Sequence, residues 1–209
     1  MIIVGICGAS GSGKSTLARE IKEQLTADAV IIGQDCYYRD HGHLPFEERA
    51  KINYDEPNVF NYDEMLRDIH TLASGRPITR KGYDYANHRR ADTDELIEPP
   101  DVLILEGIHI FHDPRLADEM SLKVYMHVDT DVCLLRRIKR DMKKRGRSIE
   151  SITEQYLTTV KPMYEQYIAD YIKDADFAVM RGGKNRRAID AISAYISAKL
   201  LAEAFERRG

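Results

Sequence analysis

The chain has 209 residues, enough for one sizeable hydrophobic core, and a formal net charge of only −3. This small charge gives no global electrostatic support for a nucleic-acid partner, and none is expected. A mean hydropathy of −0.45 and the lack of a long apolar stretch exclude a membrane-spanning helix. No charged leader with an apolar segment precedes the first predicted strand, so we expect a cytoplasmic protein.

The first predicted strand, residues 2–7, leads directly into the sequence Gly-Ala-Ser-Gly-Ser-Gly-Lys-Ser at residues 8–15. A Gly-x-x-x-x-Gly-Lys-Ser pattern after a strand is typical of a phosphate-binding loop, whose glycines let successive backbone N–H groups converge on phosphates. Apolar residues at helical spacing from Leu17 to Leu25 predict a helix whose N-terminus faces the bound anion. The nucleotide contacts predicted here are Gly8, Ala9, Ser10, Gly11, Ser12, Gly13, Lys14, Ser15 and Thr16.

Four further apolar segments alternate with helical patterns and are predicted to be strands: residues 29–32, 102–105, 122–128 and 177–180. The alternation predicts an α/β protein with three layers and a mostly parallel five-stranded sheet, in a single domain over residues 1–209.

Two acidic residues follow strands of this predicted sheet. Asp35 comes after the second strand and Glu106 after the third. The carboxyl ends of parallel strands open onto the same crevice as the phosphate loop. Asp35 is therefore a candidate general base for a hydroxyl acceptor, and Glu106 is a candidate partner of Ser15 in holding Mg²⁺. The alternative for both residues is an ordinary turn or cap.

Residues 36–100 are rich in Tyr, Asp, Asn, His and Arg and are expected to form a substrate-binding insertion. Within them, residues 62–72 have the apolar spacing of a helix that ends at Ser74 and Gly75. Residues 77–99 place apolar residues around a polar middle, a pattern consistent with a hairpin that leans out from the sheet.

Helix signals recur in the second half of the chain. Asp113 before Pro114 indicates a helix N-terminus, and Ser151-x-x-Glu154 indicates a capping box that opens a long helix. Pro162 is expected to kink or interrupt that helix. An apolar stripe within residues 189–200 predicts a last helix that packs on the sheet.

Residues 136–147 contain eight basic residues and one acidic residue. Near a phosphate loop, such a cluster favours a cationic lid, here expected at about residues 136–155, that stabilises charge on a transferred phosphoryl group. A solvated basic helix face and an RNA or DNA patch are the alternatives.

Taken together, the motifs resemble those of the phosphoribulokinase and uridine kinase family of P-loop kinases. Besides the phosphate loop, the matching stretches are residues 35–38, 53–57, 83–88, 105–108, 136–141, 145–147, 155–156, 161–162 and 181–185. The resemblance implies transfer of the γ-phosphate of ATP, or of GTP, to the 5′-hydroxyl of uridine or cytidine, with Mg²⁺ as cofactor. It also implies a role in pyrimidine salvage and a homotetramer.

The resemblance assigns roles to individual residues. Asp35 is implied to be the catalytic base, with Lys14 and Arg140 on the phosphates and Ser15 and Glu106 on Mg²⁺. Arg145, Gly183 and Asn185 are further implied contacts of the nucleotide. The implied nucleoside contacts are Asp55 on the ribose hydroxyls, Tyr83 and His88 on the pyrimidine, and Arg137, Arg147 and Gln155 near the lid.

Departures from the family pattern leave the acceptor open. Arg80-Lys81-Gly82 stands where typical members have an apolar residue, Pro and Val, and Gly82 is expected to loosen the hairpin strand that presents Tyr83. Met180 replaces a common Pro. A related kinase acting on phosphoribulose or pantothenate remains an alternative. So does a nucleotide-dependent switch or RNA-associated ATPase.

Overall fold

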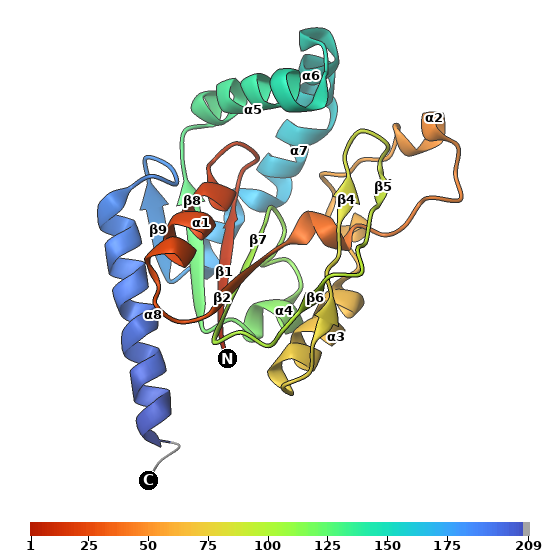
Figure 1. The fold of residues 1–209 in the computed structure, drawn as a ribbon. Coiled ribbons are helices and arrows are strands. Elements are labelled where there is room, and N and C mark those ends of the chain that lie inside the picture. The colour runs from red at the N-terminus through yellow and green to blue at the C-terminus, as the bar shows by residue number, and fades with distance from the viewer. Residues whose placement is uncertain (207–209) are drawn as a thin grey trace.

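Five parallel strands form the centre of the molecule, in the order β2-β7-β1-β8-β9 (Figure 1). The structure is a computed structural model and describes residues 1–206. In the register, Ile2 of β1 pairs with Val102 of β7, and Val4 of β1 pairs with Leu122 of β8. The sheet confirms the five predicted strands, which have the bounds Ile2–Gly8 (β1), Ala29–Gly33 (β2), Val102–Gly107 (β7), Leu122–His127 (β8) and Phe177–Met180 (β9).

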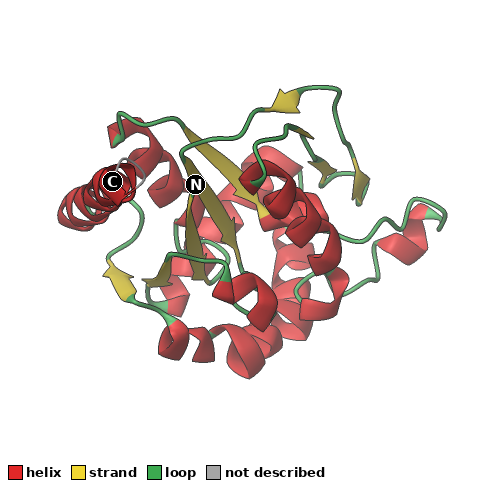
Figure 2. Ribbon diagram, turned by 90° about the horizontal axis from the view of Figure 1, so that it is seen from below, coloured by secondary structure: helices red, strands yellow, loops and turns green. Residues whose placement is uncertain are grey.

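Helices cover both faces of the sheet, as predicted for a three-layer fold (Figure 2). Successive side chains of a strand point to opposite faces, so β1 contributes to two cores. Ile2, Val4 and Ile6 pack in one hydrophobic cluster, whereas Ile3 and Cys7 pack in the other. Because both faces are buried, β1 has a continuous apolar sequence.

The first face is covered by α1 (Lys14–Gln24) and α8 (Arg186–Glu206). Helix α8 buries Ile189, Ile192 and Ile196 against the sheet, which confirms the predicted apolar stripe. It is also the longest helix at 21 residues. Within residues 1–206, neither it nor any other helix has the length and apolar character needed to cross a membrane.

The second face is covered by α3 (Tyr62–Ala73) and α4 (Pro114–Asp118). Both helices begin at side-chain caps. Asn61 accepts a hydrogen bond from the Glu64 N–H, and Asp113 accepts one from the Arg115 N–H, which confirms the predicted start at Asp113.

The segment between β2 and β7 contains short elements and a hairpin that extends beyond the sheet (Figure 1). The hairpin is built from two antiparallel pairs, β3 with β6 and β4 with β5. Besides α3, the elements are η1 (Gln34–Tyr37), α2 (Phe46–Arg49), η2 (Pro57–Val59), β3 (Ile78–Thr79), β4 (Tyr83–Asp84), β5 (Arg89–Arg90) and β6 (Leu96–Ile97).

The strand is interrupted between β3 and β4, and Gly82 within this interruption forms two hydrogen bonds. Its N–H donates to Asp92 Oδ1 at 3.1 Å, and its carbonyl accepts from the Ala91 N–H at 3.0 Å. A Cβ atom at Gly82 would collide with the Ala91 carbonyl, so glycine here permits a close backbone approach. Arg90 of β5 then forms a two-pronged ion pair with Glu64 of α3, which ties the hairpin to the body of the protein.

A helical segment follows β8 and lies over the carboxyl end of the sheet (Figure 1). Helix α5 (Thr130–Arg145) ends at Gly146, whose φ of 62° is in the left-handed region that favours glycine. Helix α6 (Ile149–Gln155) follows after a short break.

The predicted capping box at Ser151 is wrong. The N-cap is Ser148, whose hydroxyl accepts from the Ser151 N–H at 3.2 Å, so Ser151 lies inside α6. The reason is that α5 ends at Gly146 and Ser148 is the first extended residue with a capping hydroxyl after that break.

Pro162 lies in a helical run that continues from α6 without a sharp break. This run alternates wider and ordinary turns in the elements η3 (Tyr156–Val160, π), α7 (Lys161–Met163), η4 (Tyr164–Ile168, π) and η5 (Asp170–Asp174, 3-10). Pro162 has no N–H for an ordinary helical hydrogen bond, and the wider turns accommodate it. The α-helical pattern is interrupted as predicted, but the chain direction is kept.

Candidate active site

The phosphate-binding loop joins β1 to α1 and has the backbone that its glycines predict. Gly8, Gly11 and Gly13 have φ values of 142°, 87° and 102°, which side-chain-bearing residues rarely adopt. Helix α1 begins at Lys14, so its N-terminus faces the loop. The Lys14 ammonium donates to the carbonyls of Gly8 at 2.9 Å and Ala9 at 3.0 Å. The loop therefore presents N–H groups and a buried cation to an anion.

Ser15 and Glu106 lie side by side, although 91 positions separate them in the sequence. The Ser15 hydroxyl donates to Glu106 Oε1 at 2.7 Å. Burial raises the pKa of Glu106, while the Lys14 charge and the Ser15 hydrogen bond oppose the rise. Residues 1–206 contain no group of three or more His, Cys, Asp or Glu side chains that could hold a metal ion. A hydroxyl beside one carboxylate nevertheless fits Mg²⁺, which in phosphate sites takes few protein ligands and completes its shell with phosphate and water.

Asp35 lies in η1 at the carboxyl end of β2 and lines the same cavity as Lys14 and Ser15. Its Oδ2 accepts a hydrogen bond of 2.7 Å from the hydroxyl of Tyr85 in the hairpin. The sequence reasoning assigned no role to Tyr85, although the motif containing Tyr83 and His88 includes it.

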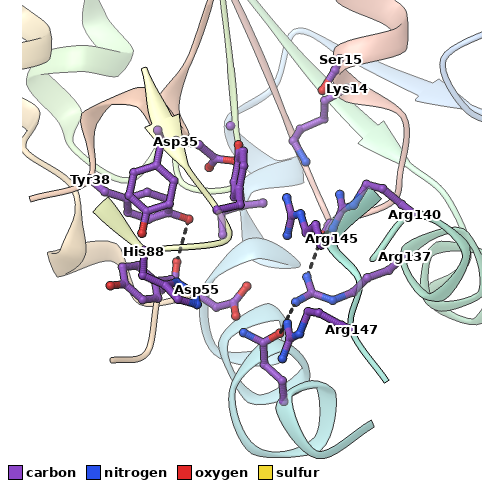
Figure 3. A pocket seen from close by; sticks show the side chains of 17 residues that line it. Lys14, Ser15, Asp35, Tyr38, Asp55, His88, Arg137, Arg140, Arg145 and Arg147 are labelled. Carbon is purple, nitrogen blue, oxygen red and sulfur yellow. Dashed lines mark hydrogen bonds between the residues drawn. The ribbon is translucent and has the colours of Figure 1, made fainter. Parts of the chain in front are cut away.

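An aromatic wall bounds one side of this cavity (Figure 3). His88 stacks on Tyr54 with a centroid distance of 4.9 Å and an interplanar angle of 16°. Tyr38 lies against Tyr83 at 4.8 Å. Sequence reasoning named Tyr83 and His88 but missed Tyr38 and Tyr54. The signal that could have identified Tyr38 and Tyr54 was their position near other aromatic residues of the insertion.

Asp55 forms the floor of the cavity between the aromatic wall and the lid (Figure 3). It is buried, and this burial raises its pKa, while the charge of Arg137 opposes the rise. The Thr159 hydroxyl donates to Asp55 Oδ2 at 3.2 Å, and the Asp55 carbonyl contacts His109 Nε2 at 2.6 Å. Asp55 is thus held by contacts from two separate segments.

Arginine side chains from the lid form the opposite wall (Figure 3). The fully buried carboxylate of Asp141 lies 2.8 Å from Arg140 Nε, 3.5 Å from Arg145 Nη1 and 3.6 Å from Arg137 Nε. These arginines together lower the pKa of Asp141, against the effect of burial. One carboxylate therefore positions three guanidinium groups.

The remaining lid residues form a second contact. Gln155 Oε1 accepts from Arg137 Nη2 at 2.8 Å and from Arg147 Nη1. Arg137 also donates to Ser10 Oγ at 2.9 Å, which joins the lid to the phosphate loop.

A second cavity also borders the phosphate loop, and Lys14, Ser15 and Arg140 line both cavities. Gly11, Gly13, Thr16 and Gly183 line this second cavity. Asn185 lines neither; its Nδ2 donates to the Met180 carbonyl at 3.0 Å and so supports the turn that carries Gly183. Gly8 and Ser12 line neither of these two cavities, and Ala9 lines a smaller pocket together with Thr130 and Cys133 of α5.

His109 supports this site from within the core. It is fully buried, its Nδ1 lies 2.9 Å from the Tyr171 hydroxyl, and burial lowers its pKa to about 4. An unfolded histidine titrates near pH 6.5. As the pH falls from about 6.5 towards 4, this histidine takes up a proton in the unfolded chain but stays neutral in the folded protein. The free energy of unfolding therefore decreases.

We expect this single group to reduce the free energy of unfolding by about 3 kcal/mol at pH 4 relative to pH 7.5. Urea unfolding of the wild type and His109→Gln across this range measures the effect. The variant should show a shallower pH dependence, and equal pH dependence in both proteins would contradict the assignment.

A strand, a phosphate loop and a helix in this order, with carboxylates at the neighbouring strand ends and a cationic helical segment above them, define a P-loop kinase. Comparison with known proteins agrees. The model of the phosphoribulokinase / uridine kinase family matches residues 3–188, and the chain belongs to this family.

Individual relatives support this membership. The chain is 46% identical to the uridine kinase of Vibrio cholerae over 205 residues, which cover 96% of each chain. It is 45% identical to the uridine kinase of Bacillus subtilis over 190 residues, which cover 90% of each chain. Among solved structures, phosphoribulokinase from Rhodobacter spheroides has the same fold, with a TM-score of 0.63, 18% identity and coverage of 86% of this chain and 69% of that one.

Proposed function

We propose that this protein transfers the γ-phosphate of ATP, or of GTP, to the 5′-hydroxyl of uridine or cytidine, giving UMP or CMP. The observation that carries the proposal is the shared cavity. One cavity brings Asp35, Asp55, the aromatic wall and the lid arginines to the phosphate-loop residues Lys14 and Ser15. The uridine kinase activity of the relatives supports the same acceptor.

The acceptor end of the cavity suits a nucleoside. The ring faces of Tyr83 and His88 suit a flat base, because aromatic side chains stack on the face of any nucleobase. The Asp55 carboxylate suits the vicinal hydroxyls of a ribose, since an ionised carboxylate accepts several hydrogen bonds. Arg137, Arg147 and Gln155 close this end from the lid side.

In the proposed reaction, the aromatic wall and Asp55 orient the nucleoside so that its 5′-hydroxyl faces Asp35. Asp35 accepts the hydroxyl proton as the new O–P bond forms, while the bond from the γ-phosphorus to the β–γ bridging oxygen breaks and ADP leaves. Lys14, Arg140 and Arg145 stabilise the charge on the transferred phosphoryl group, and the lid excludes water. Mg²⁺, held by Ser15 and Glu106, would neutralise phosphate charge when bound.

The proposal extends to the organisation of the protein. We propose one catalytic domain over residues 1–209, in which residues of the 36–100 insertion bind the acceptor and residues 136–155 act as the lid. The family resemblance supports a homotetramer that works in the cytoplasm in pyrimidine salvage. Light scattering of the purified protein tests the oligomeric state.

An acceptor panel tests the function. Purified protein is incubated with Mg²⁺-ATP and uridine, cytidine, adenosine, ribulose 5-phosphate or pantothenate, and products are identified by mass. We expect UMP and CMP and no product from the other acceptors. Phosphorylated pantothenate or ribulose bisphosphate would identify a different kinase of the family. ATP hydrolysis without any phosphorylated acceptor, together with salt-sensitive RNA binding, would favour a nucleotide-dependent switch.

A further inference from the structure

Tyr85 links three parts of the molecule that are far apart in the sequence. It follows β4 in the hairpin, and its hydroxyl donates to Asp35 Oδ2 at 2.7 Å. The guanidinium carbon of Arg145, in the last turn of α5, lies 4.1 Å from the centre of the Tyr85 ring. Tyr85 therefore joins the predicted base to the lid through two different interactions, a hydrogen bond and a cation–π contact.

The Tyr85 hydroxyl also competes with the acceptor hydroxyl for Asp35, the proposed base. A base must lie within hydrogen-bond distance of the proton that it accepts. In this structure, one oxygen of Asp35 already holds a protein hydroxyl at that distance. An acceptor hydroxyl that takes the same position on Oδ2 has to displace Tyr85.

Tyr85 stays protonated in this position. Although the residue as a whole is 39% exposed, loss of solvent around its hydroxyl and the negative charge of Asp35 raise the pKa of that hydroxyl. It therefore remains a donor through the range in which enzymes work, and it remains able to occupy Asp35.

We propose that Tyr85 is a positioning residue that occupies Asp35 and holds Arg145 of the lid while no acceptor is bound, and yields this place to the acceptor hydroxyl. The consequence is that water is kept from Oδ2 of Asp35. The inference rests on the proposed function, since it assumes that Asp35 serves as the base for a hydroxyl acceptor.

The suppressed reaction is ATP hydrolysis. In it, a water oxygen forms a bond to the γ-phosphorus, the bond from that phosphorus to the β–γ bridging oxygen breaks, and ADP leaves. Asp35 takes the water proton and returns it to solvent. With Tyr85 on Oδ2, water loses this oxygen of the base until an acceptor enters, and the acceptor then takes the site that water would use.

The variant Tyr85→Phe separates the hydroxyl from the ring. It removes the donor to Asp35 and keeps the aromatic face under Arg145. We expect the ratio of acceptor-free ATP hydrolysis to uridine phosphorylation to rise about tenfold, which corresponds to about 1.4 kcal/mol. Both rates are measured on the same preparation, as ADP released without uridine and as UMP formed with saturating uridine.

Tyr195→Phe is the matched control, because Tyr195 lies on α8, away from the cavity, with an exposed fraction of 41% against 39% for Tyr85. Its ratio should equal that of the wild type. A purely structural role for Tyr85 would lower both rates together and leave the ratio unchanged, and that result would overturn the inference. If the wild type forms no nucleoside monophosphate, the proposed function fails instead, which is a distinguishable outcome.

Calorimetric titration of uridine provides a readout that does not depend on turnover. Because uridine must displace the Tyr85 hydroxyl, Tyr85→Phe should bind uridine more tightly than the wild type. Weaker binding by the variant would show that the hydroxyl assists the acceptor rather than competing with it, and would likewise overturn the inference.

Discussion

The variant Asp35→Asn is expected to bind ATP as the wild type does and to phosphorylate uridine at least about one hundred times more slowly. General-base catalysis contributes roughly 10²- to 10⁴-fold, and an amide cannot accept the proton that a carboxylate accepts. The amide oxygen can still accept the hydrogen bond from Tyr85, so the local structure should persist. Steady-state kinetics and calorimetric titration with ATP measure the two properties separately.

Asp40→Asn is the matched control for this variant. Asp40 follows Asp35 by five positions but is exposed in the loop, where its carboxylate accepts from the Gly42 N–H. This control should retain wild-type turnover. Turnover close to that of the wild type in Asp35→Asn would remove Asp35 from the role of base.

The variant Asp141→Asn is expected to lower the free energy of unfolding by about 3 kcal/mol. Asp141 is fully buried between Arg137, Arg140 and Arg145, and Arg137 itself is only 5% exposed. Removing one partner of a buried ion pair leaves an uncompensated buried charge, a loss of roughly 3–5 kcal/mol in other proteins. Because Arg140 and Arg145 are more exposed, we expect a value at the lower end, measured by urea unfolding.

Asp170→Asn is the control for this effect. Asp170 pairs with Lys173 at 2.8 Å, but their side chains are 72% and 70% exposed. An exposed pair of this kind contributes at most about 1 kcal/mol. If both variants changed the free energy of unfolding equally, Asp141 would not have the structural role inferred here. The lid should also lose order, so uridine phosphorylation by Asp141→Asn should fall as well.

Strand positions and the phosphate loop could be predicted from sequence because their signals are local. The apolar run of β1 and the glycine spacing after it depend on near neighbours in the chain. The same holds for Asp113, a cap recognised by the proline that follows it.

Local signals were insufficient where another segment of the chain also acted on the position. Ser151 and Glu154 have the spacing of a capping box, but Ser148 lies nearer the end of α5 and caps the helix instead. Gly82 has the sequence of a weak strand position, but the hairpin pairs so closely there that only glycine fits. In both places, the preceding or facing backbone decided the outcome.

Sequence alone therefore determined the class of fold, the phosphate loop and most of the candidate site residues, because each depends on residue type and short spacing. Tertiary structure alone decided two contacts of the site: the Tyr85 hydroxyl with the Asp35 carboxylate, and the His109 ring with the Asp55 backbone carbonyl. These contacts join residues 50 and 54 positions apart in the sequence. No pattern along the chain encodes such distances, since they result from how the sheet, the hairpin and the lid pack.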